Sequence, residues 1–468
     1  MAENCVVILA GGKGTRMKTE HPKVLCQVLF KPMLSWVLDA CATAGLPAER
    51  TCVVTGYQKE AVEALVVSKD PRYQTVFQEQ RLGTGHAVMM AESFLAQNAG
   101  GNVLILYGDA PFIDPQTIRS SLAVHQQNQN AVTVVTAELK DPAYYGRIVR
   151  EGDRLQEIVE YKDATEAQRQ IHEVNSGIYW FRISALQKAL AGLNNQNTQN
   201  EYYLTDTIRI LRESGEKTEA YRTENSRVIL GANSRTDLLA LNETAKQQII
   251  SQHLENGVEF VSLDGVLIGP DVVIGPDTCI LPGTILRGKT VIGAGCTIGP
   301  DSLLEDTIVG DSTILNSVQA YQSVIHDHVK IGPFCHIRPN SEIKSGVKIG
   351  DFVEVKNSVI DESTAVAHLT YVGDSDVGKR VNFGCGVVTV NYDGLHKHRT
   401  QIGDDCFIGC NTNLVAPVTL GNGVYTAAGS TITDDVPDGA LAIARSRQEI
   451  KEGYAYQKLG DKIRRNKK

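Results

Sequence analysis

A short segment near the start of the chain, directly after an apolar run, is rich in glycine and basic residues. The run from Val6 to Ala10 has the length and composition of a buried parallel strand. The next six residues, from Gly11 to Arg16, read Gly-Gly-Lys-Gly-Thr-Arg. Three glycines let the backbone turn sharply and bring its N–H groups close to an anion, beside the positive charges of Lys13 and Arg16. This glycine-rich loop (residues 11–16) predicts a site for nucleotide phosphates. Its spacing fits neither a Walker A loop nor the G-x-G-x-x-G fingerprint, so an ordinary strand-to-helix turn is the alternative.

Two further polar segments directly follow stretches that are typical of strands. Residues 78–86 read Gln-Glu-Gln-Arg-Leu-Gly-Thr-Gly-His, and Tyr107, Gly108 and Asp109 follow the apolar run 103–106. In open parallel sheets, ligands bind at the carboxyl ends of the strands, so both segments are placed to meet a ligand. A Gly-Asp pair alone is an ordinary turn. Because Mg²⁺ prefers hard oxygen ligands and usually shares them with phosphate, we expect Asp109 downstream of the glycine-rich loop to bind Mg²⁺.

The glycine-rich loop and the residues after it resemble a known family. Residues 9–17, Leu-Ala-Gly-Gly-Lys-Gly-Thr-Arg-Met, and residues 21–25, His-Pro-Lys-Val-Leu, resemble the sugar-1-phosphate nucleotidyltransferases. Those enzymes join a nucleoside triphosphate to a sugar phosphate and release pyrophosphate. The resemblance implies that Leu9, Ala10, Gly11, Gly12, Lys13, Gly14, Thr15, Arg16, Lys23, Gln78, Gly83, Thr84, Tyr107, Gly108, Asp109, Gly146, Glu160, Asn175 and Asn233 bind the nucleotide or the nucleotide sugar.

The same resemblance divides these residues by role. It implies that Gln78, Gly83 and Thr84 recognise the base, and that Gly146, Glu160 and Asn175 hold the sugar. It also implies that Asn233 shares the metal with Asp109. The implied reaction is a displacement at the α-phosphorus by the phosphate oxygen of the sugar phosphate. That nucleophile is an anion at neutral pH, so alignment and charge neutralisation suffice and we nominate no proton-transfer residue. Glycine at position 11, where the family often has alanine, is expected to be silent.

Length and composition bound the other possibilities. At 468 residues the chain has room for two to three domains. A net charge of −8 argues against nucleic-acid binding. The sequence has no apolar run of about 18 residues and no signal-like N-terminus, so we expect no membrane insertion. Ten scattered cysteines without a C-x-x-C motif indicate reduced thiols and a cytoplasmic protein. The basic tail 462–468 is expected to be a solvated end.

Alternating patterns in the first half predict an α/β domain. Residues 51–55 and 102–107 are typical of buried strands, whereas 32–44 and 84–97 are typical of helices. A cap of the second helix is the alternative role for Thr84. This alternation predicts a Rossmann-like domain, a parallel sheet with helices on both faces, over residues 1–235. The resemblance above implies that this domain is the nucleotidyltransferase. Ser234 and Asp237 resemble a helix start and Gly257 a stop, so residues 236–256 are expected to form a linker helix that acts as a spacer.

From about residue 261 the sequence repeats with a period of six. Aliphatic residues recur at Ile268, Ile274, Ile280, Leu286, Ile292, Ile298 and Leu304, and again, after a slip in phase, from Ile331 to Val355 and from Ile402 to Ile432. A sustained period of six is neither helical nor a simple strand alternation. It predicts a parallel β-helix in which each short strand sends one aliphatic side chain into a stacked core. Resemblance to the hexapeptide-repeat families implies that the β-helix, over residues 257–468, is left-handed. It also implies that the chain assembles as a homotrimer.

Two segments interrupt or adjoin the repeat. Residues 391–400, Asn-Tyr-Asp-Gly-Leu-His-Lys-His-Arg-Thr, lack the aliphatic positions and must form a loop, which a tolerated insertion also explains. Residues 368–374 read His-Leu-Thr-Tyr-Val-Gly-Asp. Together they resemble the bifunctional N-acetylglucosamine-1-phosphate uridyltransferase/glucosamine-1-phosphate N-acetyltransferase family, over nearly the whole chain. That family acetylates glucosamine-1-phosphate with acetyl-CoA and then joins N-acetylglucosamine-1-phosphate to UTP, making UDP-N-acetylglucosamine for cell-wall and envelope precursors.

The resemblance assigns a second site to the β-helix. An amine attacking a thioester sheds a proton, and a histidine titrating near neutral pH suits that step. His368 matches the family's catalytic base. The matching contacts to glucosamine-1-phosphate are Arg338, Lys356, Tyr371, Asn382 and Asn391, and those to acetyl-CoA are Cys385, Tyr392, Cys410, Ala428 and Arg445. Alanine is usual at position 385 and serine at 410, so we expect acetyl transfer to be sensitive to thiol alkylation and to be protected by acetyl-CoA.

Two other interpretations stay open at this point. One is a nucleotidyltransferase with a single activity, in which the β-helix is only structural or regulatory. His368 with the loop 391–400 argues against it, because a scaffold needs neither. The other keeps both folds but uses a different hexose or nucleotide.

Overall fold

The computed structural model describes residues 4–152, 154–460 and 462. The chain divides into two compact units, Met1–Gln248 and Ile249–Lys468. The division falls inside one helix, α9 (Arg235–Glu255). Of the basic tail, only Lys462 belongs to the described residues; the expectation for 463–468 lies outside them. No helix in the described part of the chain is long and apolar enough to cross a membrane.

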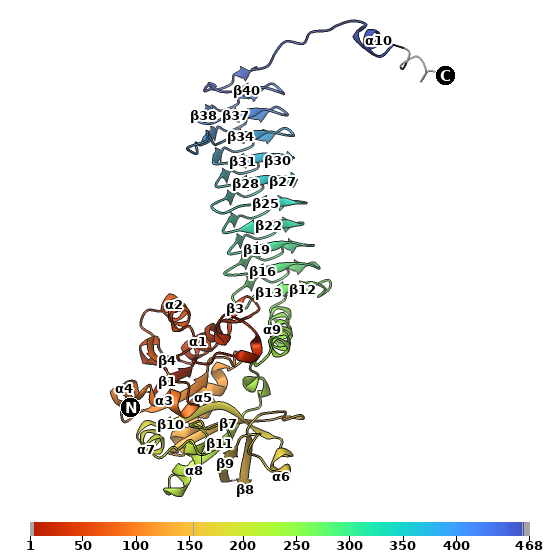
Figure 1. Ribbon diagram of the computed structural model, residues 1–468. Coiled ribbons are helices and arrows are strands. Elements are labelled where there is room, and N and C mark those ends of the chain that lie inside the picture. The colour runs from red at the N-terminus through yellow and green to blue at the C-terminus, as the bar shows by residue number, and fades with distance from the viewer. Residues whose placement is uncertain (1–3, 153, 461, 463–468) are drawn as a thin grey trace. The chain divides into compact units, whose positions relative to one another are not determined.

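The first unit is built on one mixed sheet (Figure 1). Its strand order is β11 (Thr218–Arg222), β7 (Val132–Glu138), β10 (Glu173–Arg182), β6 (Asn102–Tyr107), β1 (Asn4–Leu9), β4 (Thr51–Thr55) and β5 (Gln74–Phe77), with the hairpin β8 (Arg147–Glu151) and β9 (Arg154–Val159) attached to β10. The expectation of a wholly parallel sheet is wrong, because β10 runs antiparallel to β6 and β7. Strand β10 is buried on both faces, and a strand of that kind has the same apolar pattern in either direction.

The helices of the first unit pack against both faces of the sheet. They are α1 (Met33–Thr43), α2 (Lys59–Lys69), α3 (Thr84–Met89), α4 (Glu92–Gln97), α5 (Pro115–Gln127), α6 (Glu166–Arg169), α7 (Ile183–Ala191) and α8 (Asp206–Glu213). Short 3₁₀ turns lie at Thr15–Met17, Lys23–Leu25, Ala48–Arg50 and Ser226–Ile229, and β2 (Gln27–Val28) pairs with β3 (Lys31–Pro32). The single helix predicted over 84–97 is therefore two helices.

The structure rules out the alternative role of Thr84 as a helix cap. Gly83 occupies the cap position of α3, and Thr84 is the first helical residue. The Thr84 hydroxyl instead accepts a hydrogen bond from the Leu204 N–H, at 3.1 Å. This contact joins segments 120 residues apart, so no local pattern predicts it.

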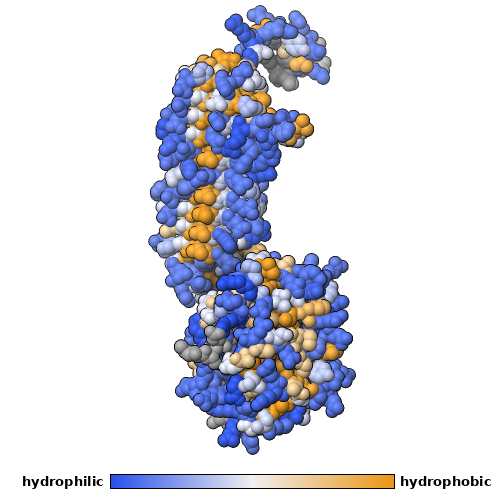
Figure 2. Space-filling model, turned by 90° about the vertical axis from the view of Figure 1, so that its left-hand side faces the viewer, coloured by the Kyte–Doolittle hydropathy of each residue, from blue (hydrophilic) through white to orange (hydrophobic). Residues whose placement is uncertain are grey.

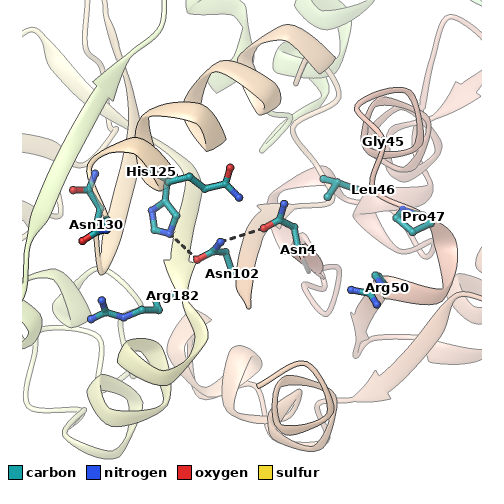
Figure 3. Close-up of a pocket in the computed structure, with 11 residues that line it drawn as sticks. Asn4, Gly45, Leu46, Pro47, Arg50, Asn102, His125, Asn130 and Arg182 are labelled. Atoms are coloured by element: carbon teal, nitrogen blue, oxygen red, sulfur yellow. Dashed lines mark hydrogen bonds between the residues drawn. The ribbon is translucent and has the colours of Figure 1, made fainter. Parts of the chain in front are cut away.

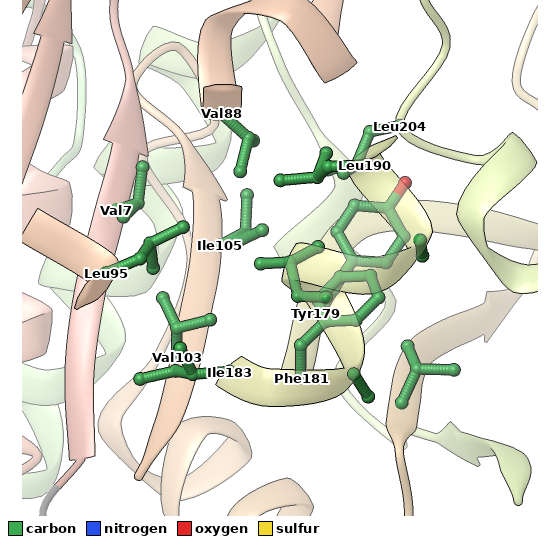
Figure 4. Packing of buried hydrophobic residues seen from close by; sticks show 14 of the residues in the cluster. Val7, Val88, Leu95, Val103, Ile105, Tyr179, Phe181, Ile183, Leu190 and Leu204 are labelled. Carbon is green, nitrogen blue, oxygen red and sulfur yellow. The ribbon is translucent and has the colours of Figure 1, made fainter. Parts of the chain in front are cut away.

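Strand alternation divides the apolar core into a layer on each side of the sheet. In β1, Val7 belongs to one cluster and Val6 and Ile8 to the other. Figure 4 shows the first cluster, where Val88 and Leu95 from helices α3 and α4 pack over Val7, Val103 and Ile105. Two buried layers require helical cover on both faces, as the sequence predicts.

Helix α9 begins at the predicted cap. The Ser234 hydroxyl accepts from the Asp237 N–H at 3.2 Å, and the Asp237 carboxylate accepts from the N–H groups of Asn233 and Ser234, each at 2.8 Å. This reciprocal arrangement satisfies backbone donors that a helix start leaves without partners. It also fixes the backbone of Asn233, the predicted metal ligand.

The second unit is a left-handed parallel β-helix with three sheets. The first sheet comprises β12 (Glu259–Phe260), β15 (Cys279–Ile280), β18 (Thr297–Ile298), β21 (Ile314–Leu315), β24 (Lys330–Ile331), β27 (Lys348–Asp351), β30 (Ala365–His368), β33 (Asn382–Phe383), β36 (Phe407–Ile408), β39 (Tyr425–Thr426) and β41 (Leu441–Ala442). The second comprises β13 (Leu267–Ile268), β16 (Ile285–Arg287), β19 (Leu303–Glu305), β22 (Val318–Tyr321), β25 (Cys335–Ile337), β28 (Glu354–Lys356), β31 (Tyr371–Gly373), β34 (Val388–Val390), β37 (Asn413–Val415) and β40 (Thr431–Ile432). The third comprises β14 (Val273–Ile274), β17 (Val291–Ile292), β20 (Ile308–Val309), β23 (Val324–Ile325), β26 (Glu342–Ile343), β29 (Val359–Ile360), β32 (Ser375–Val377), β35 (Thr400–Ile402) and β38 (Val418–Leu420). A short helix, α10 (Tyr454–Leu459), follows the coils.

The six-residue period places one side chain per strand in the core of the β-helix. Ile268 pairs with Leu286, and Leu286 with Leu304, so each of these first coils uses three strands and 18 residues. All three side chains are at most 1% exposed. The slip in phase after Leu304 does not interrupt this stack of core side chains, because Ala320 pairs with Leu304 in the next coil. Steps of five residues at some corners hide this continuity from a strict count of six.

Candidate functional sites

A cavity of about 700 Å³ opens in the first unit and brings most of the predicted nucleotide residues together. The predicted residues that line it are Leu9, Gly11, Gly12, Lys13, Gly14, Thr15, Arg16, Lys23, Gln78, Gly83, Thr84, Tyr107, Asp109, Gly146, Glu160, Asn175 and Asn233. Ala10 and Gly108 do not line it. Ala10 is 1% exposed. The Gly108 N–H donates to the carbonyl of Leu9, a lining residue, at 2.9 Å.

The glycine-rich loop packs directly on the stem of Lys23. Gly14 has a φ of +63°, in the left-handed region that favours glycine. A Cβ atom at Gly14 would lie 2.7 Å from the Lys23 Cβ. Only glycine therefore allows both the turn and this close approach, which sets the position of the Lys23 ammonium.

Lys23 occupies the centre of the predicted metal position. Its ammonium forms an ion pair with the Asp109 carboxylate and donates to the Asn233 Oδ1 at 2.8 Å. A carboxylate and an amide oxygen converging on one cation are ligands that a hard divalent metal accepts. The described residues contain no cluster of three or more His, Cys, Asp or Glu side chains able to hold a metal alone. The remaining ligands of a metal at Asp109 and Asn233 would thus be phosphate oxygens and water.

A buried polar network lies at the sugar end of the cavity. Asn175 donates to the Tyr179 hydroxyl at 2.6 Å, and the Tyr107 hydroxyl bonds with both Tyr179 and Thr84. Burial raises the pKa of the Tyr107 hydroxyl above its usual range. Burial also raises the pKa of the Glu160 carboxyl. These groups hold fixed donors and acceptors at the positions where sugar hydroxyls are expected.

At the base end, Gln78 is held by its neighbours. Its side chain is buried, and Nε2 lies 3.1 Å from both the Gly83 carbonyl and the His86 Nδ1. A Cβ atom at Gly11 would lie 3.0 Å from the Gln78 Oε1, which is tight but meets the end of a flexible side chain. Alanine at position 11 would therefore require a small shift of the Gln78 amide.

Sequence reasoning assigned no role to some lining residues. Arg81 and Tyr203 line the cavity, and Arg81 lies in the segment 78–86 that the sequence singles out. Gln199 also lines it and donates to the Tyr203 hydroxyl at 2.7 Å. Gln199 lies in a stretch rich in Asn and Gln, and no sequence motif there predicts a role in binding.

A second cavity, of about 1000 Å³, lies at the amino ends of β1 and β6 (Figure 3). His125 lines it, is 2% exposed, and lies 3.2 Å from the Asn102 Oδ1 through Nε2 and 3.0 Å from the Thr133 hydroxyl through Nδ1. Asn102 in turn donates to the Asn4 Oδ1 at 3.2 Å. In open α/β sheets the ligands bind at the opposite, carboxyl ends of the strands, so we interpret this cavity as structural.

The predicted catalytic histidine lies at the end of strand β30 of the β-helix. His368 Nδ1 is 3.1 Å from the Asp351 Oδ1, one coil below. The pKa of the Asp351 carboxyl is lowered by a backbone hydrogen bond and by the His368 ring. Since Nδ1 faces a carboxylate, it carries the proton, and Nε2 of the exposed ring is left to accept one.

Cationic side chains converge near the predicted sugar-phosphate residues. Lys356 and Lys397 lie side by side, and the hydrogen bond to Lys356, together with its charge, lowers the pKa of the Lys397 ammonium. Asn391 Nδ2 lies 3.4 Å from the Tyr371 hydroxyl. Two ammonium groups this close favour an anion between them, as a phosphate group would provide. Asn382, at the start of β33, is exposed and pairs with Ala365 rather than with this cluster.

The residues predicted to bind acetyl-CoA lie mostly on one corner of successive coils. The Gly386 N–H donates to the His368 carbonyl, the Asn411 N–H to Cys385, and the Gly429 N–H to Cys410. Three such steps at about 4.8 Å each span roughly 14 Å. Ala428 precedes Gly429, and a Cβ atom built at Gly429 would lie 3.9 Å from the Arg445 Cδ, so Arg445 lies beside the same corner. Tyr392 departs from this corner: it lies in the loop 391–400, is 57% exposed, and donates to the Gly394 carbonyl.

Comparison with known proteins agrees with both halves of this description. The Nucleotidyl transferase family model matches residues 5–227, and the Bacterial transferase hexapeptide (six repeats) model matches 271–306, 322–357 and 399–434. The fold and the cavity thus define a nucleotidyltransferase domain joined to a hexapeptide-repeat transferase. The Bifunctional protein GlmU of Thermoanaerobacter pseudethanolicus is 50% identical over 454 residues, covering 97% of this chain and 98% of that protein. The Bifunctional protein GlmU of Caldanaerobacter subterraneus subsp. tengcongensis is 50% identical over 460 residues, covering 98% and 99%.

The chain therefore belongs to the bifunctional GlmU family. It is a bifunctional transferase with acetyltransferase and uridyltransferase activity in the synthesis of UDP-N-acetylglucosamine, a cell-wall precursor. This identification rejects the alternative in which the β-helix serves only as a scaffold. Nucleotide-sugar and acetyl-CoA substrates follow from the activities, as does a divalent metal in the nucleotidyltransferase half.

Proposed function

We propose that the two reactions occupy separate sites, one in each half of the chain. Uridylyl transfer is assigned to residues 1–235 and acetyl transfer to residues 257–468, with residues 236–256 as a spacer. The observation that carries the first assignment is the convergence of Asp109, Asn233 and Lys23 opposite the glycine-rich loop, within one cavity. The observation that carries the second is the alignment of His368 with the corner that bears Cys385, Cys410 and Ala428.

In the first half, the residues align two anions and neutralise them. The N–H groups of the glycine-rich loop, with Lys13 and Arg16, hold the triphosphate of UTP. Gln78 reads the base, while Glu160 and Asn175 hold N-acetylglucosamine-1-phosphate so that its phosphate oxygen faces the α-phosphorus. The P–O bond to that oxygen forms as the bond to pyrophosphate breaks, and no proton needs to move. Mg²⁺ at Asp109 and Asn233, when bound, supplies positive charge to the phosphates.

In the second half, His368 removes the proton from the reacting amine. The amine nitrogen of glucosamine-1-phosphate attacks the thioester carbonyl of acetyl-CoA, so a C–N bond forms and the C–S bond breaks. His368 Nε2 accepts the amine proton and returns it to the leaving thiolate, while Asp351 holds the ring through Nδ1. Arg338, Lys356 and Tyr371 bind the sugar phosphate, together with Lys397, and Asn382 and Asn391 are assigned to the sugar.

We propose that the chain assembles as a homotrimer through the β-helix. Val273, Val291 and Ile308 stack in register on the outer side of the third sheet and are 57%, 38% and 50% exposed. Figure 2 shows apolar side chains in a line along the β-helix. An apolar line of this length on a flat sheet face fits burial against another copy. The ten free thiols fit the expected cytoplasmic location.

The experiment for the first site is Asp109→Asn beside Asp405→Asn, with both activities assayed on each protein. Asp405 is an exposed carboxylate of the β-helix, paired with Arg380, and serves as the control. We expect Asp109→Asn to lose uridylyl transfer and to keep acetyl transfer, because the negative charge of a metal ligand is lost in one half alone. Uridylyl transfer at the rate of the wild type would contradict the assignment.

A further inference from the structure

The second site contains a buried carboxylate to which the resemblance assigns no role. Asp374 directly follows strand β31 and is 3% exposed. Its Oδ1 accepts from the Asn357 amide at 2.5 Å, and its Oδ2 accepts from the Lys356 ammonium at 3.2 Å and from the Asn391 amide. Buried charges are costly unless such partners satisfy them. The carboxylate therefore contacts two residues of the proposed sugar-phosphate site at once.

Backbone contacts of Asp374 fix the same region. Its N–H donates to the Lys356 carbonyl at 2.9 Å, and its carbonyl accepts from the Thr400 N–H at 3.1 Å. Asn391 and Thr400 are the first and last residues of the loop that leaves the β-helix. One residue thus holds both ends of the loop, and Lys397 lies on that loop beside Lys356.

The ionisation of Asp374 is consistent with this arrangement. Burial opposes the charged form, but the hydrogen bonds from Asn357, Asn391 and Lys356 outweigh it, and the pKa of the carboxyl is lowered. The carboxylate is thus charged at neutral pH. It holds the Lys356 ammonium on one side, which leaves the remaining ammonium protons to face a phosphate.

We propose that Asp374 is the positioning residue for the sugar phosphate in acetyl transfer: it sets Lys356, and through Asn391 and Thr400 the loop that carries Lys397, in the geometry that binds glucosamine-1-phosphate. The inference rests on the proposed sugar-phosphate site. It extends that site by a residue that touches neither substrate and acts through its neighbours.

The test is Asp374→Asn, with Asp405→Asn as the matched control. Both positions are aspartates with a left-handed φ, +50° and +58°, a conformation that asparagine tolerates. In Asp374→Asn an amide N–H₂ replaces one acceptor and faces donors. We expect the KM for glucosamine-1-phosphate to rise about ten- to hundredfold, the scale of one hydrogen bond to a charged group. The KM for acetyl-CoA and the rate of uridylyl transfer should stay as in wild type.

A double-mutant cycle separates positioning from a general loss of structure. If Asp374 acts through Lys356, Asp374→Asn should change the KM much less in a Lys356→Met background than in wild type. Additive effects, or an unchanged KM in the single variant, would overturn the inference. Uridylyl transfer and the thermal midpoint report folding, and Asn391→Ala supplies a second variant if Asp374→Asn misfolds. If Lys356→Met leaves the KM for glucosamine-1-phosphate unchanged, the proposed sugar-phosphate site is wrong. If Lys356→Met raises that KM but Asp374→Asn does not, the site stands and only the role of Asp374 is wrong.

Discussion

Buried His125 makes the stability of the first unit depend on pH. Asn102 donates through Nδ2 to Asn4, so its Oδ1 accepts from His125 Nε2–H. His125 Nδ1 lies 3.0 Å from the Thr133 hydroxyl, which can donate to a neutral ring. Burial, and then the charge of Arg182 on β10, lower the pKa of the His125 imidazole to about 4. The perturbation we choose is His125→Gln, which keeps polar atoms near both partners and removes the titration.

The sign and size follow from proton linkage. In the unfolded chain a histidine binds its proton below a pKa of about 6.5, whereas in the folded unit it does so only below about 4. Between these values the unfolded state binds more protons, so the free energy of unfolding falls as the pH falls. Proton binding by the unfolded state, compared with binding by the folded state, lowers the free energy of unfolding by about 2 kcal/mol at pH 5 and about 3 kcal/mol at pH 4, relative to pH 7. Other charges near the site, Glu216 paired with Arg182 and Glu219 bonded to Asn130, remain in the variant.

Tryptophan fluorescence during urea unfolding provides the assay. Both tryptophans of the chain, Trp36 and Trp180, lie in the first unit, so the signal reports that unit. We expect wild type to lose about 2 kcal/mol more than His125→Gln between pH 7 and pH 5. Exposed His21 supplies the control, and His21→Gln should follow wild type. Equal pH dependence in wild type and His125→Gln would refute the reasoning.

Three further predictions concern the two sites. Lys23→Met should bind Mn²⁺ more tightly than wild type in nucleotide-free protein, measured by calorimetry, because no ammonium competes for Asp109 and Asn233; Lys13→Met is the control, and weaker binding would contradict the metal assignment. Alkylation should slow acetyl transfer unless acetyl-CoA is present, and Cys410→Ser should resist, since Cys410 is exposed on the corner above His368; full activity after alkylation would contradict this. Ser234→Ala should lower the free energy of urea unfolding by about 1 kcal/mol, because the α9 cap is lost; an unchanged midpoint would contradict it.

The sequence predicts those features that a local or periodic pattern records. The core column through Ile268, Leu286 and Leu304 is visible because every strand needs one aliphatic side chain, and the α9 cap is visible because Ser234 and Asp237 lie three residues apart. The direction of β10 is hidden, because a strand buried on both faces has no polarity in its pattern.

Contacts that depend on stacking between coils could not be predicted in the same way. Asp374 directly follows Gly373, which pairs with Lys356 in the coil below, but its contacts to Asn391 and Thr400 depend on how the loop leaves the β-helix. The position of Lys397 beside Lys356 depends on that loop as well. The motif containing Asp374 was visible, whereas its partners emerge only from the stacked coils.

The most direct test of the central claim is acetyl-CoA-dependent acetylation of glucosamine-1-phosphate by wild type and by His368→Ala, with uridylyl transfer assayed on both proteins. The two-site account predicts that wild type acetylates, that His368→Ala loses this activity by a factor of roughly 10² or more, and that uridylyl transfer survives in both. Acetylation by His368→Ala at the rate of wild type would contradict the account, because the base would then lie elsewhere.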